Sequence, residues 1–282
     1  MFKFRIISFT VLLCVFVFMF VCPVPGRWIF GGAAALVAFA MAREMAEMLK
    51  KLELHAFVLP AAIYSGTAVL LAALGNLCGW EPRVCAAVGA ALLAAPLVWG
   101  WGALLCGEEF ALNAKKLAVS FGILVMTLPP VYGLLNVGLL DFRLFGYLVL
   151  VTKAGDTGAY CVGMISNKIT RGHNHPVAPR ISPKKSIEGT VGGLLCSVGV
   201  SFLLGAGLGW VSAGWMTLLI CGIVMFWGGF CGDLTESVLK RGCGIKDSGK
   251  LLPGMGGIWD IMDSFIYNAP VFCLIFPFLQ LN

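Results

Sequence analysis

The chain has 282 residues, of which 59% are hydrophobic and only 12% carry a charged side chain. Soluble domains have about 25% charged residues, so these proportions exclude a soluble globular protein of this length and indicate helices that cross a membrane. The formal net charge of +6 fits orientation in a membrane and attraction to anionic lipid or nucleotide, and it does not indicate nucleic-acid binding.

Nine apolar stretches each come close to the about 20 residues that a membrane-spanning helix needs. In chain order they are approximately 6–22, 27–42, 56–79, 84–106, 117–137, 144–165, 189–210, 214–236 and 262–281. The first follows Lys3 and Arg5 as a signal peptide would, but its apolar run is longer than usual and no small-residue cleavage site follows. We therefore expect an all-α, polytopic transmembrane helical bundle of about nine spans.

The basic residues predict the orientation of these spans, because Lys and Arg collect in cytoplasmic loops. With the amino terminus in the cytoplasm, sixteen of the twenty Lys and Arg residues fall in inner segments. Arg27, Arg83 and Arg143 fall outside, and Lys153 lies within a span. We expect amino-terminal membrane spans over 1–137 and carboxyl-terminal catalytic spans over 138–282, with cytoplasmic loops at 166–188 and 240–261.

Charged residues inside the later spans are the first functional signal, because a carboxylate in lipid usually faces a cavity, a partner or an ion. They are Lys153 and Asp156 in the sixth span, Asp233 and Glu236 in the eighth, and Asp260 and Asp263 at the start of the ninth. In the eighth span, Ser237 and Lys240 continue the helix face that Asp233 and Glu236 begin. Capping or ion pairing explains one such aspartate more easily than the whole set.

Carboxylates without clustered cysteine or histidine form a hard oxygen site, which suits Mg²⁺ better than zinc. The neighbouring basic residues complement phosphate groups; they are Lys240, Arg241, Lys246 and Lys250. Glycines such as Gly256 and Gly257 let backbone N–H groups approach an anion closely. Together these features predict metal-assisted phosphoryl or nucleotidyl transfer.

Residues 231–264, CGDLTESVLKRGCGIKDSGKLLPGMGGIWDIMDS, resemble the signature of the phosphatidate cytidylyltransferase (CDP-diacylglycerol synthase) family. The residues in register with that signature are Ser237, Lys240, Arg241, Lys246, Asp247, Gly249, Pro253, Gly256, Gly257, Asp260 and Asp263. Segments 156–160 and 181–189 also resemble the family. The chain departs from the signature where Met255 replaces its histidine and Ile261 replaces its arginine.

The resemblance implies an enzyme of phospholipid biosynthesis that converts CTP and phosphatidic acid to CDP-diacylglycerol and pyrophosphate. It implies Mg²⁺ as cofactor, with K⁺ as a candidate second cation, and metal ligands at Asp233, Asp260 and Asp263. Further catalytic roles are implied for Lys240, Arg241, Lys246 and Asp247. Substrate-binding roles are implied for Asp156, Ser182, Lys184, Lys185, Ser237, Gly256 and Gly257.

Two other functions also fit the sequence. An ion-coupled membrane transporter would also place carboxylates in spans, although it predicts them near mid-membrane in two related halves. A CTP-dependent lipid-alcohol kinase would release CDP where the synthase releases pyrophosphate. We expect a bacterial inner membrane protein whose site faces the cytoplasm, and a homodimer is compatible with such a bundle although no single motif indicates one.

Overall fold

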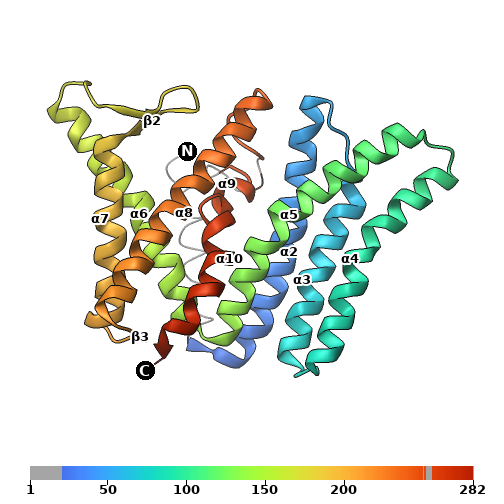
Figure 1. Cartoon of the computed structure of the whole chain (residues 1–282), viewed down its shortest axis with the longest axis horizontal. Helices are drawn as coiled ribbons and strands as arrows, with labels where there is room; N and C mark the ends of the chain where they lie inside the picture. The colour runs from blue at the N-terminus through green and yellow to red at the C-terminus, as the bar shows by residue number, and fades with distance from the viewer. Residues whose placement is uncertain (1–20, 250, 252–255, 282) are drawn as a thin grey trace. The chain divides into compact units, whose positions relative to one another are not determined.

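The computed structural model describes residues 21–249, 251 and 256–281, and these residues are mostly helical (Figure 1). The α-helices are α2 (Pro23–Leu49), α3 (Val58–Leu77), α4 (Pro82–Leu105), α5 (Phe110–Leu140), α6 (Phe142–Ile169), α7 (Ile187–Phe202), α8 (Trp215–Gly242), α9 (Trp259–Met262) and α10 (Phe265–Ile275). Each expected span from 27–42 to 214–236 coincides with one of these helices, and the last one, 262–281, contains the shorter α10. This confirms the all-α class. The expected first span, 6–22, lies almost wholly outside the described residues.

Five of the described helices are long and apolar enough to cross a membrane. They are Pro25–Leu52, Val58–Leu77, Phe110–Leu140, Ile187–Gly207 and Trp215–Gly242. The fourth of these includes the π-helical turn η2 (Leu203–Gly207). Helix α6 has 28 residues, but Lys153 and Asp156 lower its mean hydropathy. The expected span 262–281 contains a shorter apolar helix, Phe265–Phe278, because α9 ends at Met262 and the chain turns before α10. Length and composition thus support an integral membrane protein.

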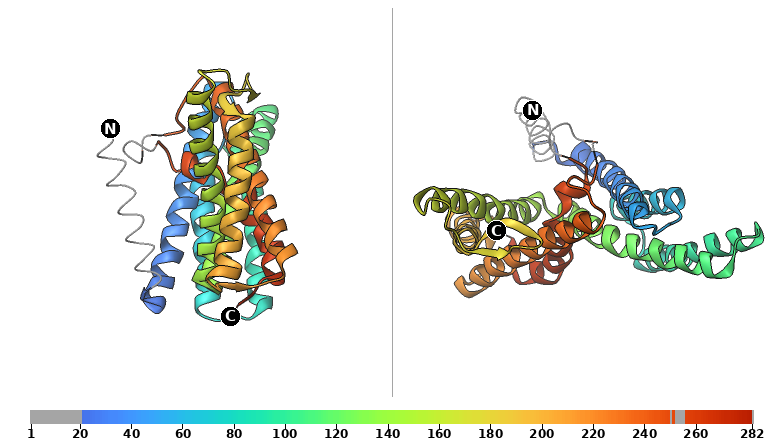
Figure 2. Two further views of the ribbon diagram at one scale, coloured as in Figure 1. Left: turned by 90° about the vertical axis from the view of Figure 1, so that its left-hand side faces the viewer. Right: turned by 90° about the horizontal axis from the view of Figure 1, so that it is seen from above.

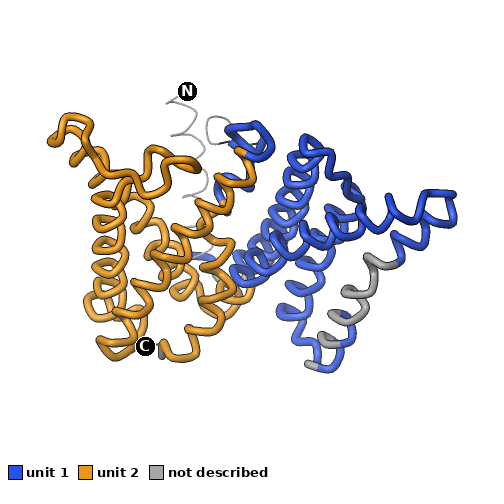
Figure 3. The backbone as a smooth tube through the Cα atoms, turned by 45° about the horizontal axis from the view of Figure 1, so that its top comes forward, with its two compact units in different colours: residues 1–135, 242–261 blue, residues 136–241, 262–282 orange. Residues whose placement is uncertain are grey.

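The chain divides into two compact units (Figure 3). Unit 1 comprises residues 1–135 and 242–261, and unit 2 comprises residues 136–241 and 262–282. Helices α2 and α3 lie side by side in unit 1, as α6 and α7 do in unit 2 (Figures 1 and 2). The glycine-rich loop after α8 therefore belongs to the same compact unit as the amino-terminal helices.

Buried polar contacts fasten the helices of unit 1. The Asn113 side chain, 2% exposed, donates from Nδ2 to the Gly100 carbonyl at 2.7 Å and ties α5 to α4. The Phe57 N–H donates to Ser120 Oγ at 3.0 Å, which ties the start of α3 to α5. Because lipid offers no hydrogen bonds, such internal partners are the way that polar groups in membrane helices are satisfied.

In unit 2, α6 and α7 approach each other through glycines. A Cβ atom at Gly189 would lie 2.7 Å from the Ala159 carbonyl oxygen, and one at Gly193 would lie 2.7 Å from the Gly155 carbonyl oxygen. Distances this short mean that the two backbones touch where these residues face each other. Small residues give membrane helices this close packing, which dispersion forces stabilise in the absence of a hydrophobic effect.

A buried amide connects α6, α8 and α10. Asn268 Nδ2 donates to Thr152 Oγ1 at 2.9 Å and to the Met225 carbonyl at 2.7 Å. Near it, the ring of Tyr147 stacks on that of Phe272 with centroids 5.9 Å apart. These contacts fix α8 and α10 against α6, and the charged residues of the later spans lie on these same three elements or beside them.

A short hairpin occupies the predicted loop 166–188. Its antiparallel strands are β1 (Pro176–Ala178) and β2 (Ser182–Ser186); a second pair joins β3 (Val211–Ser212) to β4 (Gln280–Leu281). Ser186 ends β2 and also caps α7, since its Oγ accepts a hydrogen bond from the Gly189 N–H at 3.1 Å. The cap holds the basic strand β2 against the start of α7.

Candidate active site

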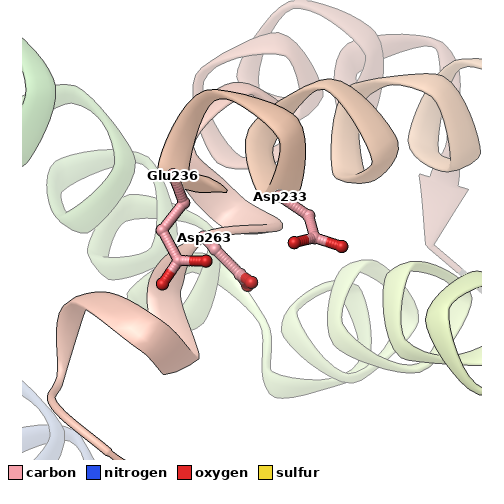
Figure 4. A group of neighbouring side chains, drawn as sticks. All are labelled: Asp233, Glu236 and Asp263. Carbon is pink, nitrogen blue, oxygen red and sulfur yellow. The ribbon is translucent and has the colours of Figure 1, made fainter. Parts of the chain in front are cut away.

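Three carboxylates converge in unit 2. Asp233, Glu236 and Asp263 each offer an oxygen, and these oxygens all lie within 4.8 Å of one another (Figure 4). Asp233 and Glu236 are one turn apart on α8, and Asp263 follows α9. Gly232 allows the approach, because a Cβ atom there would lie 2.1 Å from the Asp263 carbonyl oxygen. Three hard oxygen donors at this spacing fit a cation such as Mg²⁺.

One lysine lies against each carboxylate of this cluster. The pairs, measured between nitrogen and oxygen, are Lys185 with Asp233 at 2.7 Å, Lys240 with Glu236 at 2.7 Å, and Lys153 with Asp263 at 3.9 Å. Three close negative charges would repel one another strongly, and the three ammonium groups offset that repulsion. A divalent cation bound to these oxygens would have to compete with the lysines.

Lys153 is the centre of a second set of contacts. Its Nζ donates to Asp156 Oδ2 at 3.1 Å and to Ser264 Oγ at 2.8 Å, and it lies 5.1 Å from the centroid of the Phe265 ring. The Ser264 hydroxyl, 1% exposed, is 2.8 Å from both Asp156 Oδ2 and Asp263 Oδ1. Since a hydroxyl has one proton, it donates to one of these carboxylates at a time. The network links Asp156 to the carboxylate cluster.

A pocket of about 250 Å³ opens beside the cluster. Its polar wall is formed by Asp156, Ser182, Lys184, Lys185 and Asp233, and its apolar wall includes Phe226 and Phe230. Lys185 Nζ lies 4.3 Å from the centroid of the Phe230 ring, a cation–π distance. Pockets for drug-sized ligands are about 300–1,000 Å³, so this one fits a phosphate or a headgroup better than a whole nucleotide.

Asp260, near the end of the signature 231–264, accepts hydrogen bonds from its own loop in unit 1. The Ser248 N–H donates to its carboxylate at 3.0 and 3.2 Å, and the Gly257 N–H donates to Oδ2 at 2.8 Å. Gly256 has φ +97°, and a Cβ atom there would lie 2.2 Å from Asp260 Oδ2, so glycine is required on both counts. Two N–H groups of the glycine-rich loop thus bind the chain's own carboxylate.

The structure brings Asp156, Ser182, Lys184, Lys185 and Asp233 to one pocket, and places Asp263 in the adjoining cluster. Lys240 pairs with Glu236 of that cluster, and the loop of unit 1 contains Gly256, Gly257 and Asp260. Ser237 is partly exposed on α8, while Arg241, Lys246 and Asp247 are exposed. Ile261 is partly exposed in α9, and Met255 lies outside the described residues.

Three residues in the carboxylate cluster or in contact with it were not assigned a role from the sequence. Glu236 could have been assigned from its i, i+3 spacing to Asp233, and Lys153 from its position inside a span. Ser264 gave no signal beyond its place next to Asp263. Its contacts with α6 depend on tertiary packing across more than 100 residues of sequence.

A family model described as the cytidylyltransferase family matches residues 3–279. The chain belongs to the cytidylyltransferase family. The phosphatidate cytidylyltransferase of Staphylococcus saprophyticus is 42% identical over 132 residues, which make up 47% of this chain and 47% of that relative. These findings confirm the resemblance that residues 231–264 indicated.

Other curated proteins match to a similar extent. The phosphatidate cytidylyltransferase of Staphylococcus haemolyticus is 42% identical over 125 residues, covering 44% of this chain and 45% of that protein. A protein of Escherichia coli named YnbB, described as uncharacterized, is 37% identical over 126 residues, covering 45% of this chain and 40% of its own. The chain thus spans about half the length of the curated relatives that it matches.

Proposed function

We propose that this member of the cytidylyltransferase family is a phosphatidate cytidylyltransferase, which converts CTP and phosphatidic acid to CDP-diacylglycerol and pyrophosphate in phospholipid biosynthesis. One observation of the site carries the proposal. Asp233 belongs both to the carboxylate cluster and to the pocket, where it forms an ion pair with Lys185 of the basic strand β2. Sites for a cation and for a phosphate group are therefore contiguous, as nucleotidyl transfer requires.

The reaction does not need a strong general base. A lipid phosphate carries about −1.5 to −2 charges at pH 7, so one of its oxygens is already a nucleophile. That oxygen forms a bond to the α-phosphorus of CTP while the bond from the α-phosphorus to its bridging oxygen breaks, and pyrophosphate leaves. We assign Lys184 and Lys185 to the lipid phosphate in the pocket. Lys240, Arg241 and Lys246 would bind the nucleotide phosphates, and Ser237 would donate a hydrogen bond.

Asp233 and Asp263 are proposed cation ligands, and their cluster adds Glu236. Asp260, which belongs to unit 1, is proposed as a cation ligand from the family resemblance. Bound Mg²⁺ would neutralise charge on the triphosphate, and K⁺ is the proposed second cation. A cation held by Asp233 would displace the Lys185 ammonium from that carboxylate and leave it available to bind a phosphate in the same pocket. Cation binding and anion binding would then favour each other, and such coupling is reciprocal.

We further propose nine spans with the amino terminus in the cytoplasm, in a bacterial inner membrane, so that the site meets soluble CTP. The supporting observation is the distribution of Lys and Arg along the sequence. Trypsin added to inside-out vesicles should cut after the exposed Arg180, whereas right-side-out vesicles should protect it. A homodimer is a prediction that analytical ultracentrifugation in detergent would test.

The reaction is tested with the purified protein in detergent–phosphatidate micelles, with CTP labelled in the cytidine and in the γ-phosphate. Label from cytidine in the lipid and release of pyrophosphate, both abolished by a chelator, are the expected result. Release of CDP with phosphate transferred to a lipid alcohol would instead show a kinase. Absence of any nucleotide-dependent product with several phosphatidates would contradict the proposal.

A further inference from the structure

Glu44 lies on α2, more than 200 residues before the glycine-rich loop, yet its carboxylate binds that loop. Glu44 Oε2 accepts a hydrogen bond from the Trp259 N–H at 3.0 Å and one from Ser248 Oγ at 3.4 Å. Both elements belong to unit 1. A partly buried carboxylate with backbone and hydroxyl donors makes charge-assisted hydrogen bonds, which are about twice as strong as neutral ones.

The same carboxylate explains two glycines of the loop. A Cβ atom at Gly249 would lie 2.6 Å from Glu44 Oε1, and one at Gly257 would lie 2.4 Å from Glu44 Oε2. The backbone at both positions therefore packs directly against the glutamate. Glu44 thus contacts the two ends of the loop, at Ser248–Gly249 and at Gly257–Trp259, and holds them together.

These two ends are also the segments that fix Asp260. The N–H groups of Ser248 and Gly257 donate to the Asp260 carboxylate, one from each end of the loop. Glu44 binds the side chain of Ser248 and packs on Gly257, so it contacts both segments that donate to the Asp260 carboxylate.

We propose that Glu44 is a positioning residue, which sets the orientation of Asp260 for cation binding by clamping the two ends of its loop. The proposal rests on the proposed function, in which Asp260 is a cation ligand. Groups that orient metal ligands typically change metal affinity by about 10-fold to 100-fold when they are removed. The sequence offers no local signal for Glu44, because nothing near residue 44 resembles the signature.

The test measures Mn²⁺ binding to the full-length protein in detergent, without nucleotide or phosphatidate, from the electron paramagnetic resonance signal of free Mn²⁺. Glu44→Ala should bind Mn²⁺ about 10-fold to 100-fold more weakly than the parent. Glu44→Gln should stay within about threefold, because its amide oxygen still accepts from the Trp259 N–H. Glu47→Ala is the matched control: Glu47 lies one turn further along α2, pairs with Lys50 at 2.9 Å on the surface, and should bind as the parent does.

Gel filtration and thermal melting show first whether Glu44→Ala is folded. If it is not, Glu44→Asp replaces it, since its carboxylate is one methylene too short for the Trp259 N–H, and weaker Mn²⁺ binding is again expected. In turnover assays the folded variant should need more Mg²⁺ for half-maximal rate, with the KM for CTP at saturating Mg²⁺ nearly unchanged. If Glu44 only stabilised the fold, the Mg²⁺ concentration for half-maximal rate and the KM for CTP would both stay at parent values.

Parental Mn²⁺ affinity in the folded Glu44 variant would overturn the proposal, as would a parent protein that binds no Mn²⁺. A parent that binds Mn²⁺ in a Glu44-dependent manner but forms no CDP-diacylglycerol would support the positioning role and refute the proposed reaction. The binding assay and the product assay therefore separate the two failures.

Discussion

Replacing Lys185 with glutamine should strengthen cation binding while weakening catalysis. Its ammonium lies 2.7 Å from Asp233, with 18% of the lysine side chain and 36% of the aspartate side chain exposed. Exposed ion pairs contribute about 0–1 kcal/mol, and breaking a buried pair costs about 3–5 kcal/mol. For this intermediate case we take about 1–2 kcal/mol, which a cation must overcome to displace the lysine. Removing the competitor should thus raise Mn²⁺ affinity by about 5-fold to 30-fold.

The assay is a Mn²⁺ titration of Lys185→Gln without CTP or lipid, followed by turnover at saturating Mg²⁺. Lys184→Gln is the matched control: Lys184 lies next to Lys185 in β2 and lines the same pocket, and it is exposed. Both variants should turn over more slowly because both lysines are assigned to the lipid phosphate, but only Lys185→Gln should bind Mn²⁺ more tightly. Equal or weaker Mn²⁺ binding by Lys185→Gln, or an equal gain in Lys184→Gln, would refute the competition.

Three further substitutions test the site. Asp260→Asn should lower kcat by at least about 100-fold at ordinary Mg²⁺, because an amide is a poorer cation ligand, and full activity in the product assay would remove the ligand assignment. Ser264→Ala should destabilise the protein by about 1–3 kcal/mol, since it removes a hydroxyl from a buried network; an unchanged melting temperature would contradict this. Gly232→Ala should cost about 1–3 kcal/mol in a thermal melt because its Cβ would clash with the Asp263 carbonyl, whereas Gly199→Ala, with nothing within 4 Å, should not destabilise.

Hydropathy predicted the helices well because lipid forces every backbone group into helical hydrogen bonds. It placed the last helix poorly, since the apolar run 262–281 includes the turn between α9 and α10. The loop 166–188 was expected only as a polar connection, and its two short strands lack the alternating pattern that predicts a strand.

The local signature predicted which residues carry the chemistry, whereas their pairing depended on tertiary structure. Spacing placed Asp233 and Glu236 on one face, but no pattern showed that Lys185 would reach Asp233 from a hairpin 48 positions earlier. The contact between Glu44 and Trp259 joins positions 215 apart, and a single sequence contains no information on such contacts.

The close contact of α6 and α7 has a consequence for how this pocket can evolve. Gly155 and Gly189 line the pocket and lie where the two backbones touch, so main-chain atoms form part of its lining. Side chains that line a pocket can change rotamer or be exchanged, and the pocket then accepts a new ligand. Two backbones in contact permit neither, so ligand preference should change through the side chains that line the pocket, such as Phe226 and Phe230.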